Sequence, residues 1–218
     1  MCVVSNNNSD RYTAIKKKCY IDNGVPSQVV VARNLDSKGA MSIATKIAIQ
    51  LNCKLGGAPW CLKIPVSNLM IVGYDACHDT HNKSKSYGAL VASLNKQATH
   101  YYSSVTPHSD GQEMSRNIGL SIVKACKAYM EVNGNLPQKI LFYRDGVGEG
   151  QIPYIFEQEL MSIKNILEEN LYPNNVLKMC FIIVSKRINT RIFGKRGQEY
   201  CNPQPGTVVD DCITLPER

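Results

Sequence analysis

The order of apolar segments between residues 68 and 185 constrains the fold of this 218-residue chain more than any other feature. Five runs of strand length accompany two segments whose apolar residues recur at helical spacing. The expected strands are 68–75, 86–95, 100–107, 138–145 and 176–185, and the expected helices are 112–131 and 154–171. The second and third runs, joined by a short polar turn, predict an antiparallel hairpin. The whole order predicts an α/β fold with a mixed sheet and helical crossovers.

The first 60 residues follow a different pattern. Ser9 or Asp10 is placed to cap a short helix that ends near Cys19. The elements expected after it are a buried strand over 27–34 and a helix over 41–51. The stretch KLGGAPW then interrupts the helical spacing, which predicts a domain boundary between residues 57 and 64.

We therefore expect two domains, 1–60 and 61–218. The chain closes with GTVVDDCITLPER, a loop-like stretch without a further element, so we expect a truncated second domain. No apolar run approaches the roughly 20 residues that span a bilayer, and the N-terminus lacks the pattern of a secretory signal. These features predict an intracellular protein with no membrane partner.

Positive charge is concentrated near the N-terminus. Residues 1–60 hold eight Lys or Arg against three Asp, which is +5 of the net +7 of the chain. A basic region predicts an anionic partner, with nucleic acid or phosphate first. The alternative is a solvated lysine face, which composition alone leaves open.

The nine cysteines show no C-x-x-C spacing. Most have apolar neighbours, as Cys53, Cys126 and Cys180 do, which predicts reduced core thiols and argues against a zinc or disulfide framework.

The stretch LFYRDGVGEGQ ends an apolar strand on Asp145 and follows it with three glycines. Asp75 ends another expected strand, and Glu113 opens the long helix. Ligands gather at the carboxyl ends of strands in sheets of this class, and carboxylates are ligands that Mg²⁺ prefers. The three acids suggest a divalent-metal site for phosphodiester chemistry, with glycines that let a nucleic-acid backbone approach. The alternatives are an ordinary turn and a helix-capping acid.

Several stretches resemble one protein family, in the order of that family and over nearly the whole chain. VGYDACHDT, GQEMS, FYRDGVGEGQ and IIVSKRINTRIF resemble the Piwi domain of Argonaute proteins, particularly of the Piwi clade. SNNNSDRYTAIKKKC, PSQVVVARN and ATKIAIQLNCKLGG resemble the MID domain that precedes it. The resemblance implies a partial, Rossmann-like MID domain over 1–60. It implies an RNase H-like Piwi domain over 61–218 that lacks its C-terminal part.

By this resemblance, Asp75 and Asp145 are catalytic aspartates that bind Mg²⁺, and Glu113 completes the site when guide and target are loaded. Slicing members add a histidine much further along. The histidines of this chain are 78, 81, 100 and 108, so the family's histidine would fall beyond Arg218. His78 and Asp79 follow Asp75 closely, but strand alternation points immediate neighbours apart, so we leave both out of the site.

The MID resemblance implies a pocket for the 5′-phosphate of a guide RNA. Tyr12 and Lys16 are four residues apart on the expected helix and share a face. Tyr12 would stack on the first base, and Lys16, Gln28 and Lys54 would bind the phosphate. Gln50 stands where many Argonaute-clade proteins have Lys, and it would help to hold a second Mg²⁺ beside the phosphate.

Other contacts follow from the same resemblance. The loop at 6–11 lies where the family reads the first nucleotide. Lys186, Arg187 and Arg191 follow a buried strand and would contact the backbone of guide or target RNA.

The function implied is small-RNA-guided (piRNA-like) binding of complementary target RNA in gene or transposon silencing, with a Mg²⁺-dependent slicer in the full-length protein. One alternative is a non-catalytic RNA-binding silencing scaffold, and another is an RNase H-like nuclease that acts without a guide. Tudor-type partners would bind regions upstream of Met1. The expected location is the cytoplasm, in perinuclear granules, or the nucleus, and not the secretory route.

Overall fold

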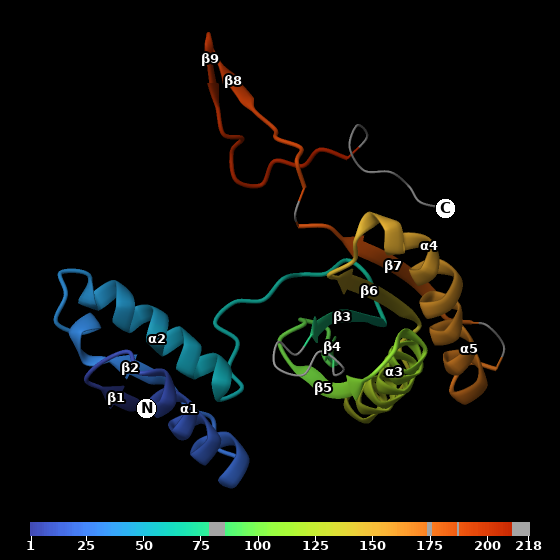
Figure 1. Cartoon of the computed structure of the whole chain (residues 1–218), viewed down its shortest axis with the longest axis horizontal. Coiled ribbons are helices and arrows are strands. Elements are labelled where there is room, and N and C mark those ends of the chain that lie inside the picture. The colour runs from blue at the N-terminus through green and yellow to red at the C-terminus, as the bar shows by residue number, and fades with distance from the viewer. Residues whose placement is uncertain (79–85, 174–175, 187, 211–218) are drawn as a thin grey trace. The chain divides into compact units, whose positions relative to one another are not determined.

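The structure is a computed structural model that describes residues 1–78, 86–173, 176–186 and 188–210 (Figure 1). Its contacts divide the chain into two compact units, Met1–Val184 and Ser185–Arg218. The segment 55–68, where the predicted domain boundary lies, contains neither helix nor strand. The boundary itself stays a prediction.

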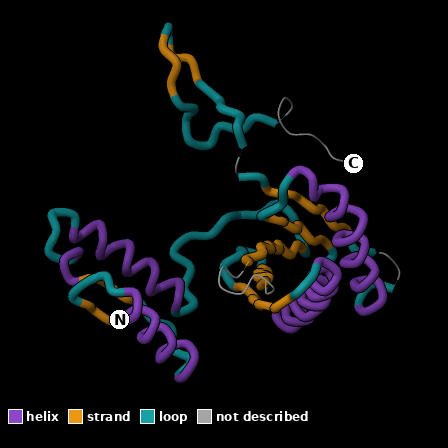
Figure 2. The backbone as a smooth tube through the Cα atoms, viewed as in Figure 1, coloured by secondary structure: helices purple, strands orange, loops and turns teal. Residues whose placement is uncertain are grey.

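Residues 69–184 of the first unit contain a mixed five-stranded sheet of order β5-β4-β3-β6-β7 (Figure 2). Its strands are β3 (Leu69–His78), β4 (Ser86–Ser93), β5 (Tyr101–His108), β6 (Lys139–Asp145) and β7 (Lys178–Val184). β3, β4 and β5 pair antiparallel, whereas β6 pairs parallel with both β3 and β7. The predicted α/β class, mixed sheet and hairpin are therefore confirmed.

Two helical segments supply the crossovers between the parallel strands. The first is α3 (Gly111–Asn133), which Asp110 caps at its start and left-handed Gly134 ends. The second combines η3 (Glu149–Gln151), α4 (Ile152–Tyr154), the π turn η4 (Ile155–Leu160) and α5 (Met161–Asn170).

The core lies between one face of the sheet and helices α3 and α5. Alternate residues of β3 and β6, among them Val72 and Phe142, are fully buried there. They pack with residues at helical spacing such as Ile118 and Ile122 of α3 and Ile163 of α5. The sheet has period 2 and the helices have period 3.6, as the sequence pattern predicts.

The N-terminal part contains a small parallel pair of strands and two longer helical segments. Its elements are β1 (Cys2–Val4), α1 (Ser9–Lys16), the π turn η1 (Lys17–Asp22), β2 (Val29–Val31), η2 (Ala32–Asn34) and α2 (Ala40–Lys54). The strand is shorter than predicted because residues 32–34 turn into a 3₁₀ helix. The helical stretch also runs past Cys19, because a π turn continues it to Asp22.

The predicted cap of α1 is wrong by one residue. Asn8, rather than Ser9 or Asp10, has the extended backbone of an N-cap, and its side chain accepts a hydrogen bond from the Arg11 amide at 2.8 Å. Asn, Ser and Asp are all good capping residues, so their succession does not identify the cap.

The prediction of core thiols is correct for Cys126 and wrong for Cys53 and Cys180. Cys53 lies on α2, a helix with no buried residue. Cys180 lies between Met179 and Phe181, which both pack on the core, so alternation turns its side chain to the opposite face.

The second unit contains a short antiparallel hairpin of β8 (Gly194–Arg196) and β9 (Glu199–Cys201). Gly197, at a φ of 65°, lies in its turn. Within the described residues, no helix has both the length and the apolar character needed to cross a bilayer.

Candidate functional site

Two lysines from different helices converge on one buried residue, Ser27. The Lys16 ammonium donates hydrogen bonds to the Ser27 carbonyl oxygen at 2.9 Å and to its hydroxyl at 3.0 Å. The Lys54 ammonium donates to the same carbonyl at 2.8 Å and to Oε1 of Gln28 at 2.7 Å. Three predicted phosphate-binding residues, Lys16, Gln28 and Lys54, therefore lie together.

The convergence brings two positive charges to one carbonyl oxygen. Within the described residues, neither Lys16 nor Lys54 takes part in an ion pair. Two like charges at one oxygen repel each other, and an anion placed between them would relieve this repulsion. The arrangement is suited to a phosphate or a carboxylate.

Two tyrosine rings flank the Lys16 ammonium. Its nitrogen lies 5.5 Å from the ring centre of Tyr12 and 4.9 Å from that of Tyr20. Both distances are in the range of a cation–π contact. The Tyr20 hydroxyl also lies 3.5 Å from both the amide nitrogen and the carbonyl oxygen of Ser27. This backbone contact, together with the two nearby lysines, lowers the pKa of Tyr20.

Sequence reasoning missed Ser27 and Tyr20. Tyr20 follows Lys16 by four residues, so the spacing that paired Tyr12 with Lys16 also indicates Tyr20. A helix that ends near Cys19, as the sequence predicts, leaves Tyr20 outside it. Gln50 is exposed on α2, one turn before Lys54, and no hydrogen bond joins it to the lysine cluster within the described residues.

A small cavity of about 150 Å³ adjoins Tyr12. It is lined by the segment Asn6–Asn8, by Arg11 and Tyr12, and by valines 4, 29 and 31. The Arg11 guanidinium donates to Ser5 Oγ at 3.2 Å and to Asn6 Oδ1 at 3.1 Å, which holds this loop. Much of the loop where the family resemblance places the first nucleotide therefore lines this cavity.

Asp75 and Asp145 lie on neighbouring parallel strands. Tyr74 of β3 pairs with Arg144 of β6, so the next residues of the two strands are the two aspartates. Asp145 ends β6 as predicted. Asp75 does not end β3, because pairing with β4 extends the strand to His78.

One of the three glycines after Asp145, Gly146, lies at a position where the structure favours glycine. Its φ is 75°, a conformation that favours glycine, and a Cβ added to it would lie 3.0 Å from Oδ1 of Asp75. Its amide donates to Asp145 Oδ1 at 2.8 Å, and the Ala76 amide donates to Asp75 Oδ1 at 2.8 Å. The residue after Asp145 thus approaches the carboxylate of Asp75. Gly150 has nothing within 4 Å of such a Cβ.

Glu113 acts as part of a helix cap. Its carboxylate accepts hydrogen bonds from the Ser109 amide at 2.7 Å and from the Ser109 hydroxyl at 2.8 Å, which lower its pKa. The described residues contain no group of three or more His, Cys, Asp or Glu that could hold a metal ion. The structure therefore brings Asp75 and Asp145 together, and Glu113 does not complete a cluster with them.

A buried ion pair involves Arg144, the residue before Asp145 on β6. Arg144 and Glu159 are 4% and 0% exposed, and Arg144 Nε donates to Glu159 Oε1 at 2.9 Å. The same guanidinium donates to the backbone carbonyl of Asp145 and lies 5.0 Å from the Tyr74 ring centre. Burial raises the pKa of Glu159, and Arg144 opposes this rise. The pair thus ties the end of β6 to η4.

The three predicted backbone-contact residues follow β7. Lys186 and Arg191 are exposed, and Arg191 donates to the carbonyls of Ile188 and Thr190 at 2.8 and 3.0 Å. Arg187 lies outside the described residues. These three assignments stay predictions.

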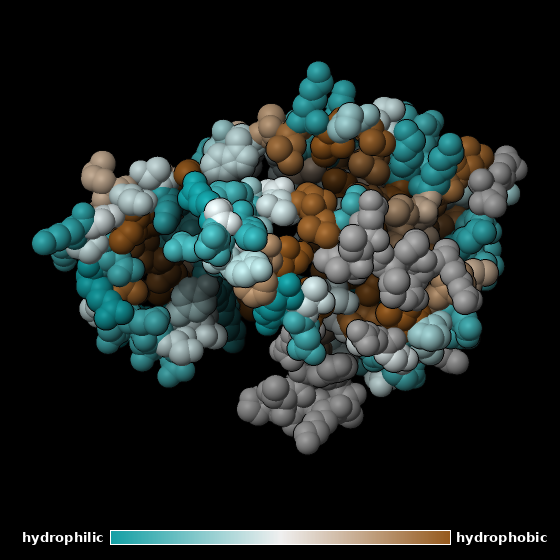
Figure 3. Space-filling model, turned by 90° about the horizontal axis from the view of Figure 1, so that it is seen from above, coloured by the Kyte–Doolittle hydropathy of each residue, from teal (hydrophilic) through white to brown (hydrophobic). Residues whose placement is uncertain are grey.

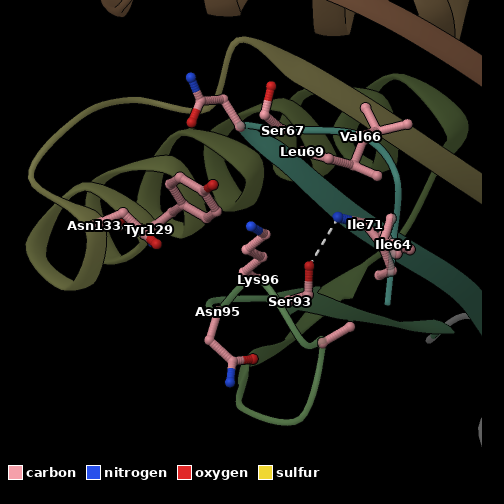
Figure 4. Close-up of a pocket in the computed structure, with 12 residues that line it drawn as sticks. Ile64, Val66, Ser67, Leu69, Ile71, Ser93, Asn95, Lys96, Tyr129 and Asn133 are labelled. Atoms are coloured by element: carbon pink, nitrogen blue, oxygen red, sulfur yellow. Dashed lines mark hydrogen bonds between the residues drawn. The ribbon is translucent and has the colours of Figure 1, made fainter. Parts of the chain in front are cut away.

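A second cavity, of about 160 Å³, lies near the start of β3 (Figure 4). Leu69, Ile71, Ser93, Lys96 and Tyr129 are among its lining residues. The Ser93 hydroxyl accepts a hydrogen bond from the Ile71 amide at 2.9 Å there. None of the predicted site residues lines it.

The profile of the Piwi domain family matches residues 1–218. The chain belongs to the Piwi domain family. The Piwi-like protein Siwi of Bombyx mori is 58% identical over 218 residues, which cover 100% of this chain and 24% of Siwi. Protein aubergine of Drosophila melanogaster is 46% identical over 229 residues, which cover 100% of this chain and 26% of aubergine.

Solved structures agree with this assignment. The crystal structure of Drosophila Piwi matches with a TM-score of 0.83 and 40% identity, over 100% of this chain and 29% of that one. The Piwi-clade resemblance and the RNase H-like fold class are therefore confirmed. The chain spans about a quarter of the length of the curated relatives it matches.

Proposed function

We propose that this Piwi domain chain binds the 5′-phosphate of a short, piRNA-like guide RNA and presents the guide to complementary target RNA in gene or transposon silencing. The observation that carries the proposal is the convergence of Lys16 and Lys54 on Ser27, with neither lysine in an ion pair among the described residues. Family membership supports a small-RNA ligand.

Different residues of the cluster would contact the phosphate and the first base of the guide. The two ammonium groups turn from the Ser27 carbonyl to phosphate oxygens, and the Gln28 amide adds a donor next to Lys54. The half-exposed Tyr12 ring offers a stacking surface for the first base, beside the cavity of the 6–11 loop. Gln50, one turn from Lys54, is the residue proposed to hold a Mg²⁺ ion beside the phosphate.

The aspartates belong to a second part of the proposal. Mg²⁺ in proteins is commonly held by one or two carboxylates together with substrate phosphates, and Asp75 with Asp145 provides such a pair. The ion would supply charge stabilisation at the scissile phosphodiester. In the full-length protein, hydrolysis there would add water at phosphorus and break the bond to the 3′ oxygen. The products are a 3′-hydroxyl and a 5′-phosphate, with Glu113 and a histidine of the longer protein completing the site.

One observation favours the non-catalytic scaffold as the second candidate. Ser109 holds the carboxylate of Glu113, so among the described residues Asp75 and Asp145 are brought together without it. In a full-length protein, Asp75→Ala separates the candidates. Loss of silencing with guide loading intact supports slicing, and unchanged silencing supports the scaffold. The wider proposal adds Tudor-type partners and a location in cytoplasmic perinuclear granules or the nucleus.

The proposal is tested by fluorescence-anisotropy titration of the chain with short single-stranded RNA that carries either a 5′-phosphate or a 5′-hydroxyl, with and without Mg²⁺. We expect tighter binding of the phosphorylated RNA, a further gain with Mg²⁺, and loss of the preference in Lys16→Ala and Lys54→Ala. Equal affinity of the wild-type chain for the two RNAs contradicts the proposal.

Lys17→Ala is the matched control. Lys17 is exposed next to Lys16, and it shares none of the Ser27 contacts described above. The substitution removes the same charge from the same helical stretch. We expect it to weaken the binding of both RNAs slightly and to preserve the phosphate preference.

A further inference from the structure

We infer that Tyr20 is a positioning residue of the phosphate site. Its ring holds the Lys16 ammonium in place while the first base of the guide stacks on the ring of Tyr12. The inference rests on the proposed function and extends it to a residue outside the predicted phosphate set.

The contact distances favour Tyr20 over Tyr12 as the permanent neighbour of Lys16. The ammonium nitrogen lies 4.9 Å from the Tyr20 ring centre and 5.5 Å from the Tyr12 ring centre. Tyr12 also lines the cavity of the 6–11 loop, whereas Tyr20 does not. A base that enters this cavity therefore meets Tyr12 and leaves the ring of Tyr20 to the lysine.

The Tyr20 hydroxyl anchors its ring to the same residue that both lysines contact. It lies 3.5 Å from the Ser27 amide nitrogen and 3.5 Å from the Ser27 carbonyl oxygen. Ser27 is 4% exposed, so this anchor is a buried part of the fold. The ring is thereby held beside Lys16 even though Tyr20 itself is 46% exposed.

The backbone at Tyr20 has the conformation of a π turn. α1 passes into the π turn η1 directly after Lys16, and Tyr20 lies within that turn. The Val25 amide donates to the Cys19 carbonyl at 2.8 Å, where the chain leaves the helical stretch. Single π turns occur frequently at functional sites, because the wider turn redirects side chains from the helix face.

The experiment compares Tyr20→Leu with Tyr20→Phe in the full chain, using the ratio of dissociation constants for 5′-hydroxyl and 5′-phosphate RNA. An exposed cation–π contact contributes about 0.5–1 kcal/mol. We therefore expect Tyr20→Leu to reduce the ratio about two- to fivefold, and Tyr20→Phe, which keeps the ring but loses the hydroxyl anchor, to reduce it less. Tyr200→Leu on β9 is the control for loss of an exposed tyrosine.

Three results overturn the inference while leaving the proposed function standing. They are a wild-type ratio in Tyr20→Leu, equal losses in the Leu and Phe variants, and equal weakening of both RNAs, which indicates a purely structural role. A wild-type chain without any phosphate preference instead overturns the proposed function.

A measurement without RNA tests the contact separately. The ring of Tyr20 should shift the NMR signals of the Lys16 ε-methylene protons upfield in the wild type and in Tyr20→Phe. Tyr20→Leu should reduce this shift, and an unchanged shift overturns the inference.

Discussion

Gly146 combines a left-handed backbone conformation with close contact to the carboxylate of Asp75. An alanine there would be strained at a φ of 75°, and its Cβ would press on Asp75 Oδ1 at 3.0 Å. We expect Gly146→Ala to lower the free energy of unfolding by about 1–2 kcal/mol. Urea denaturation followed by circular dichroism measures the change.

Gly150→Ala is the matched control for this prediction. It lies four residues further along, without a positive φ and with nothing within 4 Å of an added Cβ. We expect a change within about 0.5 kcal/mol. Equal losses in the two variants would show that Gly146 has no special role.

Ser109 lowers the pKa of Glu113. Its amide and hydroxyl both donate to the carboxylate, which holds the pKa below the usual 4.5. The hydrogen bonds therefore stabilise the fold above pH 4.5, and this contribution is lost as the pH falls through the depressed pKa. We expect Ser109→Ala, which removes only the hydroxyl, to raise the pKa part of the way towards 4.5 in a ¹³C NMR titration.

Ser115→Ala provides the comparison for that titration. The Ser115 hydroxyl donates to the Gly111 carbonyl in the same helix, at 2.9 Å. We expect the pKa of Glu113 to stay at its wild-type value in this variant. An unchanged pKa in Ser109→Ala would argue that the backbone amide alone sets it.

The ion pair between Arg144 and Glu159 joins two elements, β6 and η4. Glu159→Leu leaves the guanidinium buried without its partner, which costs about 3–5 kcal/mol of stability. The double variant Arg144→Met/Glu159→Leu removes both charges, so we expect it to be more stable than Glu159→Leu alone. Urea denaturation of the three proteins tests this order.

The partly exposed pair of Lys164 and Glu168 on α5 is a control for that series. Its atoms lie 3.7 Å apart at i and i+4, with side chains 48% and 33% exposed. We expect Lys164→Gln to change stability by about 0.5 kcal/mol or less. A comparable loss at both pairs would contradict a special role for the buried one.

Element types were predictable from the sequence, and element ends often were not. The strands and helices of the sheet follow apolar periodicity, which tertiary packing reinforces. The sequence predicts a strand end at Asp75, where polarity begins, yet pairing with β4 carries β3 to His78. It predicts a helix end near Cys19, and the π turn that continues the helix to Asp22 has no periodic signature in the sequence.

The candidate site is predictable where the family resemblance points to side chains, and not where the backbone forms it. The MID resemblance implies that Lys16 and Lys54 bind a phosphate, and the helical spacing adds only that Tyr12 and Lys16 share a face. Ser27 joins them through its carbonyl oxygen, a group that every residue has, so no side-chain pattern points to it. The resemblance implies that Glu113 belongs to a catalytic set, and the structure shows its capping contacts with Ser109.

At the scale of the whole molecule, much apolar surface is open. Figure 3 shows brown, apolar residues among hydrophilic ones on the visible face. Exposed apolar side chains include Ile21, Met41, Leu55 and Leu62, each more than 70% exposed. The relatives are about four times as long as this chain, so we expect further segments of a full-length protein to cover part of this surface.

The central claim is that the lysine cluster at Ser27 receives the 5′ end of an RNA. Amide NMR of the chain, titrated in parallel with 5′-phosphate and 5′-hydroxyl RNA, tests it most directly. The account predicts that the shifts that depend on the phosphate are largest at Ser27, Gln28 and the residues of η1. Phosphate-dependent shifts confined to another basic segment, such as residues 188–196, would contradict it.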